Sequence, residues 1–235
     1  TDPDSFLLAL EDLGDASDYT SIYQEDVFLD SADLYRAIYY LHKLHLLPLS
    51  AFPLNEEMRK LNHEHIFHFP FNSENGLDLE GIQKGLGQVA LPFQKDTILK
   101  GKIQRLGEVY LSQGRCLIHG DYYPGSWLKT DRGLMVIDPE FAFHGPPEFD
   151  LAVMFAHLIM AKHNPAVLKK AWQNYHAPAN FDHRLLSSFT GVEIMRRIIG
   201  IAQLPLSLTI ADKINLMSKA SEWIREENLL DKINI

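Results

Sequence analysis

The chain has 235 residues, of which 46% are hydrophobic and 23% are charged, and its formal net charge is −9 at pH 7. This length is enough for one sizeable core or two small ones. The 22 lysines and arginines are scattered, whereas binding to a nucleic-acid backbone requires clustered basic residues, so we expect no nucleic-acid partner. The single cysteine, Cys116, excludes an internal disulfide framework.

The sequence shows no sign of a membrane segment. Residues 1–4 are acidic and polar, unlike a signal peptide. The longest strongly apolar stretch, residues 151–161, is far too short to span a bilayer. We therefore expect a soluble, cytoplasmic protein without a membrane partner, whereas the oligomeric state is not indicated by the sequence.

The first half of the chain is predicted to be mainly helical. Residues 6–10 are a short apolar run typical of a buried strand, which residues 11–15 end with turn-forming side chains. A helix is predicted from Ser31, because apolar residues then recur at helical spacing on one face. Residues 54–78 are aromatic and irregular, which favours a loop with short helices, and residues 97–112 return to helical spacing.

The middle of the chain predicts a β-hairpin. Residues 116–118 are a short apolar strand that leads into the polar stretch 119–126. Residues 127–129 and 134–137 are two further strands, joined by a turn at 130–133 whose glycine tolerates a positive φ. We therefore expect a hairpin with a polar loop at its mouth.

The rest of the chain predicts helices, over residues 149–163, 165–175, 183–204 and 211–228. Helices thus dominate, with one small hairpin and one or two edge strands. The predicted fold class is α+β and mostly helical.

Three carboxylates are expected at the mouth of the hairpin. Asp121 follows one strand, and Asp138 and Glu140 follow its returning partner. Pro139 favours an extended Asp138, and side chains at i and i+2 of an extended segment share a face. Crowded carboxylates need a cation between them, and Mg²⁺ prefers oxygen ligands. This arrangement suits phosphoryl transfer, in which a carboxylate accepts the proton of the acceptor hydroxyl.

The loop at the hairpin mouth has the spacing of a kinase catalytic loop. Protein kinases have His-x-Asp there, followed five residues after the Asp by a metal-binding Asn. Here a His-Gly-Asp tripeptide at residues 119–121 is followed by Ser126, and Asp138 would play the part of the downstream metal-binding Asp. His-Gly-Asp in place of His-Arg-Asp resembles the aminoglycoside phosphotransferase and choline kinase superfamily.

Two details narrow the resemblance to the methylthioribose kinase family. That family ends the catalytic loop with Gly-Ser, as at residues 125–126, and has Asp-x-Glu in place of Asp-Phe-Gly, as at residues 138–140. The similarity is most specific over residues 117–150. Residues 195–200 resemble a segment whose paired arginines contact the sugar substrate in that family, and residues 8–13 resemble the hinge strand that cradles adenine.

The resemblance implies an ATP-dependent kinase that phosphorylates a hydroxyl of a small molecule with the help of Mg²⁺. The implied roles are Asp121 as catalytic base; Asp138, Glu140 and Ser126 near the metal; the backbone around Glu11 and Leu13 at adenine; Arg196 and Arg197 at the acceptor; and His119 and Asp150 as hydrogen-bonding braces of the loop. The expected acceptor is a methylthioribose-like sugar. The alternatives are an aminoglycoside or choline-type acceptor, or a kinase-like binding module without catalysis.

The resemblance also divides the chain. Residues 1–15 would be the hinge strand and linker of a small lobe, and residues 16–235 the C-terminal lobe of a kinase-like fold. Within it, residues 116–140 would form the catalytic hairpin and residues 147–228 the substrate-side helices. No Gly-rich loop with a following strand lysine precedes the expected hinge in residues 1–15, so we expect the N-terminal lobe to be absent or lost. We expect a piece of a longer kinase rather than a relative that has lost catalysis, and no turnover by this chain alone.

Two other patterns have simpler explanations. Residues 85–90 match a dinucleotide-binding glycine pattern, which requires a preceding strand, whereas residues 79–84 look helical. His63, His65 and His68 have spacing compatible with zinc, but they lie beside Phe67, Phe69 and Phe71 and are expected to pack within a loop.

The substrate-side residues are open to two interpretations. Arg196 and Arg197 are adjacent, so they point about 100° apart on a helix. Without the resemblance, one would be solvated and the other would form a structural salt bridge. Tyr122, Tyr123 and Trp127 either line an acceptor pocket or pack in the core. Residues 122–124 also depart from the family, which has a Leu-His-Thr type of sequence there.

Overall fold

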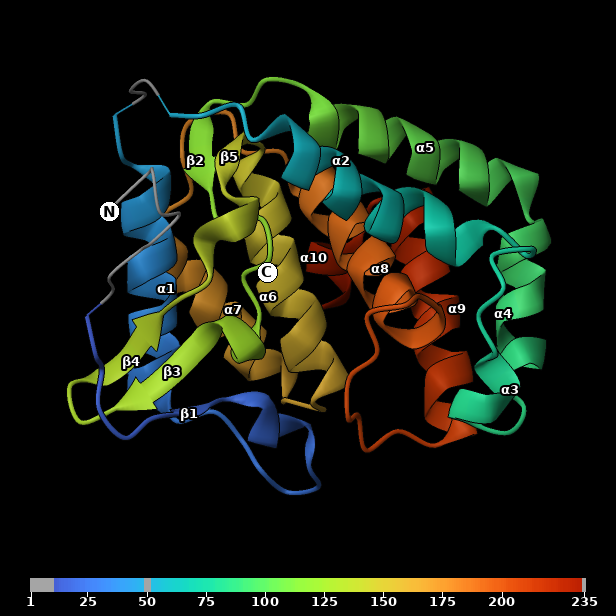
Figure 1. Cartoon of the computed structure of the whole chain (residues 1–235), viewed down its shortest axis with the longest axis horizontal. Helices are drawn as coiled ribbons and strands as arrows, with labels where there is room; N and C mark the ends of the chain where they lie inside the picture. Colours follow the sequence, from blue (N-terminus) through green and yellow to red (C-terminus); the bar gives the residue numbers. More distant parts are fainter. Residues whose placement is uncertain (1–10, 49–51, 234–235) are drawn as a thin grey trace, which may run out of the picture.

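The computed structural model describes residues 11–48 and 52–233. The predicted strand at residues 6–10 lies outside these ranges. The described helices are α1 (Ser31–His45), α2 (Glu56–His63), α3 (Leu79–Ile82), α4 (Leu86–Lys95), α5 (Thr97–Leu111), α6 (Pro147–Met160), α7 (Pro165–Tyr175), α8 (His183–Ile199), α9 (Ile210–Glu226) and α10 (Leu229–Lys232). The described strands are β1 (Ser17–Asp18), β2 (Cys116–Ile118), β3 (Trp127–Thr130), β4 (Gly133–Val136) and β5 (Phe143–Gly145). The mostly helical α+β fold class is confirmed (Figure 1).

Side-chain caps fix where the long helices begin. Asp30, Asp96 and Asp182 each accept a hydrogen bond from a backbone N–H in the first turn of α1, α5 and α8. Such caps satisfy amide groups that the helix itself leaves unpaired. The predicted helix over 183–204 is five residues too long, because α8 ends at Ile199 and Gly200 leaves helical geometry.

Helices α6 and α8 form the centre of the core (Figure 1). They pack against each other, α8 also packs against α9, and α6 contacts α1 and α7. Almost every residue of both helices is buried, which is the pattern of a helix surrounded by protein. Polar side chains on these helices must therefore find partners inside the protein, since a buried unpaired polar group is costly.

The predicted hairpin is confirmed, and a second small sheet accompanies it. Strands β3 and β4 pair antiparallel, and β1 adds to the free edge of β3. The expectation that the strand before Asp138 is the partner of the strand before Asp121 is wrong, because β4 pairs with β3, whereas β2 pairs with β5, with Ile118 opposite Phe143. This antiparallel register brings the loop that follows β2 and the segment that precedes β5 to the same end of the sheet. Residues 119–126 and 137–142 therefore meet there.

The expectation of an extended Asp138 is wrong. Asp138 has φ 58° and ψ 59°, in the left-handed region, and residues 139–141 form a 3₁₀ turn. Residues 137–142 must lead the chain from β4 in one sheet to Phe143, which pairs with β2 in the other. Proline disfavours the right-handed helical region at the preceding residue, and aspartate is one of the residues that tolerate the left-handed region. A turn at Asp138 satisfies both constraints.

The predictions of short helices in residues 54–78 and of a helix before the glycine pattern are confirmed. Residues 54–78 contain α2, a π-helical turn over residues 64–68 and a 3₁₀ turn over residues 69–71. The glycine pattern at residues 85–90 is preceded by α3, a helix, and not by the strand that a dinucleotide site requires. Among the described residues, no helix is both long and apolar enough to cross a membrane.

Candidate active site

The loop after β2 is held by a buried carboxylate in the first turn of α6. Asp150 is fully buried, its Oδ2 accepts a hydrogen bond from the backbone N–H of His119 at 2.7 Å, and its Oδ1 accepts one from Gly120 at 2.9 Å. The Nε2 of His45 lies 3.1 Å from the same Oδ2. On the other side, Asn62 Nδ2 donates to the carbonyl of Gly120 at 2.9 Å. The backbone that carries Asp121 is therefore fixed from two directions.

The His119 side chain joins the two loops that meet at this end of the sheet. It is buried, and its Nε2 lies 2.8 Å from the carbonyl oxygen of Ile137. Its Nδ1 accepts a hydrogen bond from the backbone N–H of Asp121 at 3.3 Å. These partners assign the neutral tautomer with the proton on Nε2. His119 and Asp150 thus make the hydrogen bonds that bracing the loop requires.

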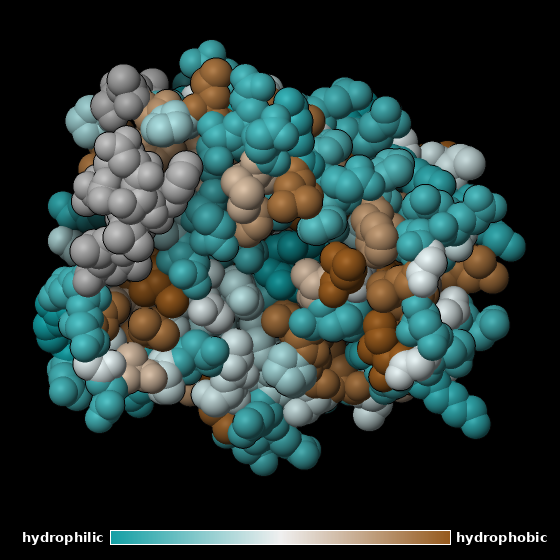
Figure 2. All heavy atoms as spheres, viewed as in Figure 1, coloured by the Kyte–Doolittle hydropathy of each residue, from teal (hydrophilic) through white to brown (hydrophobic). Residues whose placement is uncertain are grey.

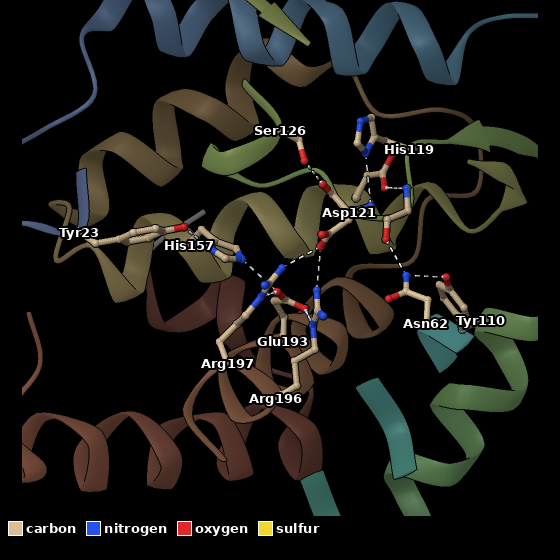
Figure 3. A network of polar contacts seen from close by, with 12 residues as sticks. Tyr23, Asn62, Tyr110, His119, Asp121, Ser126, His157, Glu193, Arg196 and Arg197 are labelled. Carbon is tan, nitrogen blue, oxygen red and sulfur yellow. Dashed lines mark hydrogen bonds and ion pairs between the residues drawn. The ribbon is translucent and has the colours of Figure 1, made fainter. Parts of the chain in front are cut away.

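The carboxylate of Asp121 points at two arginines (Figure 3). Its Oδ1 accepts hydrogen bonds from Nη2 of Arg196 and Nη2 of Arg197, each at 2.8 Å, and the side chain is 19% exposed. Both arginines are buried, at 3% and 4% exposure. The interpretation with one solvated arginine is therefore wrong, because both long side chains bend from α8 toward one carboxylate.

Glu193 completes this arrangement from the same helix, one turn before the arginines. Its Oε1 accepts from Arg197 Nε at 2.8 Å, and its Oε2 accepts from Arg196 Nε. Burial alone would raise the pKa of Glu193, but the two guanidinium charges outweigh burial and hold the pKa well below its usual value. Sequence reasoning missed Glu193, although its i, i+3 and i, i+4 spacing to the arginines is the signal for such pairs.

A histidine and a tyrosine lie behind Glu193. His157 Nε2 is 2.9 Å from Glu193 Oε1, and its Nδ1 is hydrogen-bonded to the hydroxyl of Tyr23. Burial lowers the pKa of His157 to about 4, so the imidazole is neutral near pH 7. Burial also raises the pKa of Tyr23 well above its usual value, so its hydroxyl is protonated and donates to Nδ1 while His157 donates from Nε2 to Glu193.

The predicted metal residues have a donor set that fits Mg²⁺ only in part. Asp138 and Glu140 are exposed. Ser126 is buried, and its hydroxyl donates to the carbonyl of Asp121 at 2.9 Å. Within residues 11–48 and 52–233, no three His, Cys, Asp or Glu side chains gather into a metal-binding group. Because Mg²⁺ is usually held by one or two carboxylates together with substrate phosphates, two exposed carboxylates at the loop are a suitable partial set.

The predicted adenine residues lie on the β3–β4 side of the molecule. Glu11 is exposed, and its Oε1 pairs at 3.0 Å with Nη2 of Arg132 in the turn between β3 and β4. Leu13 is half-buried. The structure thus ties the start of the described chain to the catalytic hairpin, and it does not bring Glu11 or Leu13 into contact with Asp121.

The aromatic residues of the loop divide between core and site. Tyr122 and Trp127 are buried, at 1% and 0% exposure, so they pack in the core. Tyr123 is half-buried, and its ring lies 4.5 Å from the guanidinium carbon of Arg197. Tyr123 alone of the three therefore contacts the arginine pair.

The three closely spaced histidines pack on helical turns rather than within a loop. The ring of His63 lies 5.4 Å from that of Phe67, and the ring of His65 lies 6.5 Å from that of Phe69. His68 Nδ1 is 2.7 Å from Glu64 Oε1. These contacts explain the histidines without a metal ion.

The face that holds the site is hollowed and polar. Figure 2 shows strongly hydrophilic atoms in a hollow near the middle of the molecule, where Figure 1 places the region between α6 and α8.

Comparison of the sequence with family models gives a match to the Phosphotransferase enzyme family over residues 6–187, which is more than half of the chain. The chain belongs to this phosphotransferase family. The resemblance to the aminoglycoside phosphotransferase superfamily is thereby confirmed.

The relatives in this family include methylthioribose kinases. The chain is 33% identical over 107 residues to the methylthioribose kinase of Exiguobacterium sibiricum, which covers 46% of this chain and 27% of that protein. It is 26% identical over 181 residues to the methylthioribose kinase of Bacillus pumilus, and this match covers 63% of this chain and 45% of that protein. It is 38% identical over 72 residues to methylthioribose kinase 1 of Oryza sativa subsp. japonica, and this match covers 31% of this chain and 17% of that protein. The chain thus spans less than half the length of each of these curated relatives.

A solved structure in the comparison is choline kinase LicA from Streptococcus pneumoniae. It matches with a TM-score of 0.47 and 15% identity, and the match covers 92% of this chain and 69% of that chain. A likeness at this level carries no argument about the acceptor. Membership of the phosphotransferase family implies ATP as the phosphoryl donor.

Proposed function

We propose that the protein transfers a phosphoryl group from ATP to a hydroxyl of a methylthioribose-like sugar. The observation that carries this proposal is the Asp121 carboxylate, held by two buried arginines at the mouth of the loop. The methylthioribose kinases among the relatives support the choice of acceptor. The arginine pair supports it too, because planar guanidinium groups suit the recognition of oxygen-rich ligands.

Asp121 is the proposed catalytic base. Its Oδ1 receives both arginines, and no donor in the described part of the chain hydrogen-bonds its Oδ2. The side chain is partly exposed, so an acceptor hydroxyl can approach this second oxygen. In this mechanism the hydroxyl gives its proton to Oδ2 as its oxygen attacks the terminal phosphorus of ATP. The leaving ADP keeps the electrons of the broken P–O bond.

Asp138 and Glu140 are the residues proposed to hold Mg²⁺, with Ser126 close by. When bound, Mg²⁺ neutralises phosphate charge during the transfer. The chain's own contribution is positional, because Ser126 hydrogen-bonds the carbonyl of Asp121 and so keeps the catalytic loop in place. The backbone around Glu11 and Leu13 is the proposed adenine contact.

The decisive experiment is a coupled assay of Mg²⁺-dependent ADP release by the full-length gene product that contains residues 1–235. Methylthioribose, choline and an aminoglycoside are offered as acceptors. We expect turnover with methylthioribose, its loss in Asp121→Asn, and its retention in Asp131→Asn, which removes an exposed carboxylate of the β3–β4 turn. Equal activity of the wild type and Asp121→Asn would exclude Asp121 as the base. A preference for choline or the aminoglycoside would change the acceptor but keep the chemistry.

Binding of Mg-ATP without turnover of any acceptor would favour a non-catalytic binding module. Isothermal titration calorimetry with Mg-ATP on the same protein makes this distinction. A heat of binding together with ADP release supports the kinase, and a heat of binding alone contradicts it.

A further inference from the structure

Glu193 is placed to control the orientation of both arginines. Each of its carboxylate oxygens accepts the Nε–H of one arginine, Oε2 from Arg196 and Oε1 from Arg197. A guanidinium group is planar, so fixing Nε in a hydrogen bond also fixes the directions of the other N–H groups. The Nη2 atoms of both arginines then point at the same oxygen of Asp121 (Figure 3).

Glu193 is itself held on its far side. His157 Nε2 donates to Oε1, and the Tyr23 hydroxyl fixes the other nitrogen of the imidazole. Both Glu193 and His157 are buried, at 1% and 0% exposure, and Tyr23 is buried at 2%. Because these side chains have partners on opposite sides, the carboxylate has a single well-defined orientation.

The charges of the group balance only when all four ionised side chains are present. Two guanidinium groups carry two positive charges, and the carboxylates of Glu193 and Asp121 carry two negative ones, while His157 is neutral. Buried charges are stable only when they are paired and hydrogen-bonded. Loss of the Glu193 charge would leave one excess positive charge beside Asp121, and both guanidinium groups would have Asp121 as their remaining anionic partner.

We propose that Glu193 is a positioning residue of the phosphotransfer site: it orients Arg196 and Arg197 so that together they hold Asp121 Oδ1 and leave Oδ2 to the acceptor hydroxyl. This inference rests on the proposed function for its kinetic consequence. Glu193 touches neither substrate nor Asp121, and its effect passes through the two guanidinium groups. His157 and Tyr23 support it from behind.

The test compares Glu193→Gln with Glu148→Gln in the full-length gene product that contains this chain. Glu148 is a matched control, since it is buried at 1% exposure and its Oε1 accepts from Arg115 Nη2 at 2.8 Å, away from the arginine pair. Both substitutions remove a buried carboxylate that pairs with arginine. We expect Glu193→Gln to lower kcat/KM for methylthioribose on the order of 10²-fold, as displacement of reacting groups by about 1 Å does. The KM for ATP should stay near the wild-type value, and Glu148→Gln should leave both constants unchanged.

A second readout does not depend on turnover. The Nε–H groups of buried arginines that donate to a carboxylate give resolved ¹H–¹⁵N NMR signals, and we expect two such signals to move in Glu193→Gln and to stay in place in Glu148→Gln. If the wild type phosphorylates no acceptor, the proposed function fails, while the NMR comparison still tests whether Glu193 fixes both arginines. Unchanged Nε–H signals in Glu193→Gln would overturn the proposal, as would an unchanged kcat/KM in a protein that turns over.

Should Glu193→Gln fail to fold, Glu193→Asp provides the same test with the charge retained. This variant withdraws the carboxylate by one methylene group, so it keeps the charge balance and disturbs the hydrogen-bond geometry. We expect a folded protein with displaced Nε–H signals and a lowered kcat/KM for methylthioribose. Wild-type behaviour of Glu193→Asp in both measurements would overturn the positioning role.

Discussion

Glu193 and Asp121 are bridged by the same two guanidinium groups. Arg196 and Arg197 each donate from Nε to Glu193 and from Nη2 to Asp121. Two residues that are adjacent in sequence and begin in different directions on α8 therefore act as one unit. This geometry connects the loop that follows β2 to α8, one of the two helices at the centre of the core.

The first prediction concerns the role of Asp121. Asp121→Asn keeps the shape of the side chain and removes the group that would accept the proton. We expect kcat to fall by about 10²–10⁴-fold, the usual contribution of a general base. The Kd for Mg-ATP should change little, because Asp121 faces the acceptor rather than the nucleotide in the proposed mechanism. Single-turnover kinetics measure the fall in kcat. A kcat within a factor of two of the wild type would contradict the role of Asp121 as the base.

The second prediction concerns the backbone before Asp121. Gly120 has φ +83°, and a Cβ added to it would lie 2.4 Å from the carbonyl oxygen of Phe141. Gly120→Ala should therefore combine backbone strain with a steric clash that displaces the catalytic loop. Gly76→Ala is the matched control, because Gly76 has φ +78° but open space around its Cβ position. We expect Gly76→Ala to lose about 1–2 kcal/mol in the free energy of unfolding from strain alone.

Urea denaturation measures both variants. Gly120→Ala should lose more stability than Gly76→Ala and should also lose activity, whereas Gly76→Ala should keep its activity. Equal losses in the two variants would show that the contact with Phe141 is relieved at no cost.

The third prediction concerns Asp150, which joins α6 to the catalytic loop. Asp150→Asn replaces a carboxylate oxygen by an NH₂ group that must face a backbone N–H of the loop, that of His119 or that of Gly120. Leaving such a buried donor unpaired costs about 1–3 kcal/mol. We expect a loss of this size in the free energy of unfolding, measured in urea, with Asp131→Asn as the exposed control. A variant as stable as the wild type would mean that Asp150 does not brace the loop.

The fourth prediction concerns the metal. Asp138 lies in the left-handed region, which asparagine also tolerates, so Asp138→Asn removes a charge without adding backbone strain. We expect the Mg²⁺ concentration for half-maximal turnover to rise on the order of 10-fold to 100-fold, equivalent to about 1.4–2.8 kcal/mol. Glu140→Gln should act in the same direction. An unchanged Mg²⁺ requirement in both variants would exclude them as ligands.

The sequence located the catalytic loop well because the relevant signals are local. The spacing from His119 to Ser126 and the apolar runs on either side lie within a short stretch, and the β3–β4 hairpin formed as predicted. The geometry of Asp138 was missed because it depends on the pairing of β2 with β5, which brings together residues far apart in the chain. The backbone preference of a residue before proline allows more than one conformation of Asp138. The pairing of β2 with β5 selects the turn among them.

The network behind the arginines was not predictable in the same way. Tyr23, His157 and Glu193 come from three separate segments. His157 and Glu193 meet where α6 packs against α8, and Tyr23 reaches His157 from a turn 134 residues earlier in the chain. Glu193 carried a local signal in its spacing to Arg196 and Arg197, but i, i+4 pairs are also common on solvated helix faces. The ion pairs of Glu193 with Arg196 and Arg197 differ from those pairs because all three side chains are buried. Their burial follows from the fold and not from the helix alone.

The fifth prediction concerns the pH dependence of stability. His157 has a pKa of about 4 in the folded protein because it is buried, against 6.5 for an ordinary histidine in the unfolded chain. Between these values the unfolded chain binds a proton that the folded protein does not. The free energy of unfolding therefore falls as the pH drops from about 6.5 toward 4, by about 1.4 kcal/mol per pH unit for one proton, and this contribution is fully present above pH 6.5.

His157→Gln removes this titration and keeps the means to hydrogen-bond on both sides, since a glutamine amide can donate to Glu193 and accept from Tyr23. Burial also lowers the pKa values of His63 and His163, but both remain in the variant, so their contributions cancel in the comparison. Urea denaturation between about pH 7 and pH 5 should show a slope shallower by up to one proton in His157→Gln. Parallel stability profiles for the two proteins would mean that the pKa of His157 is the same in the folded protein as in the unfolded chain, which would contradict the prediction.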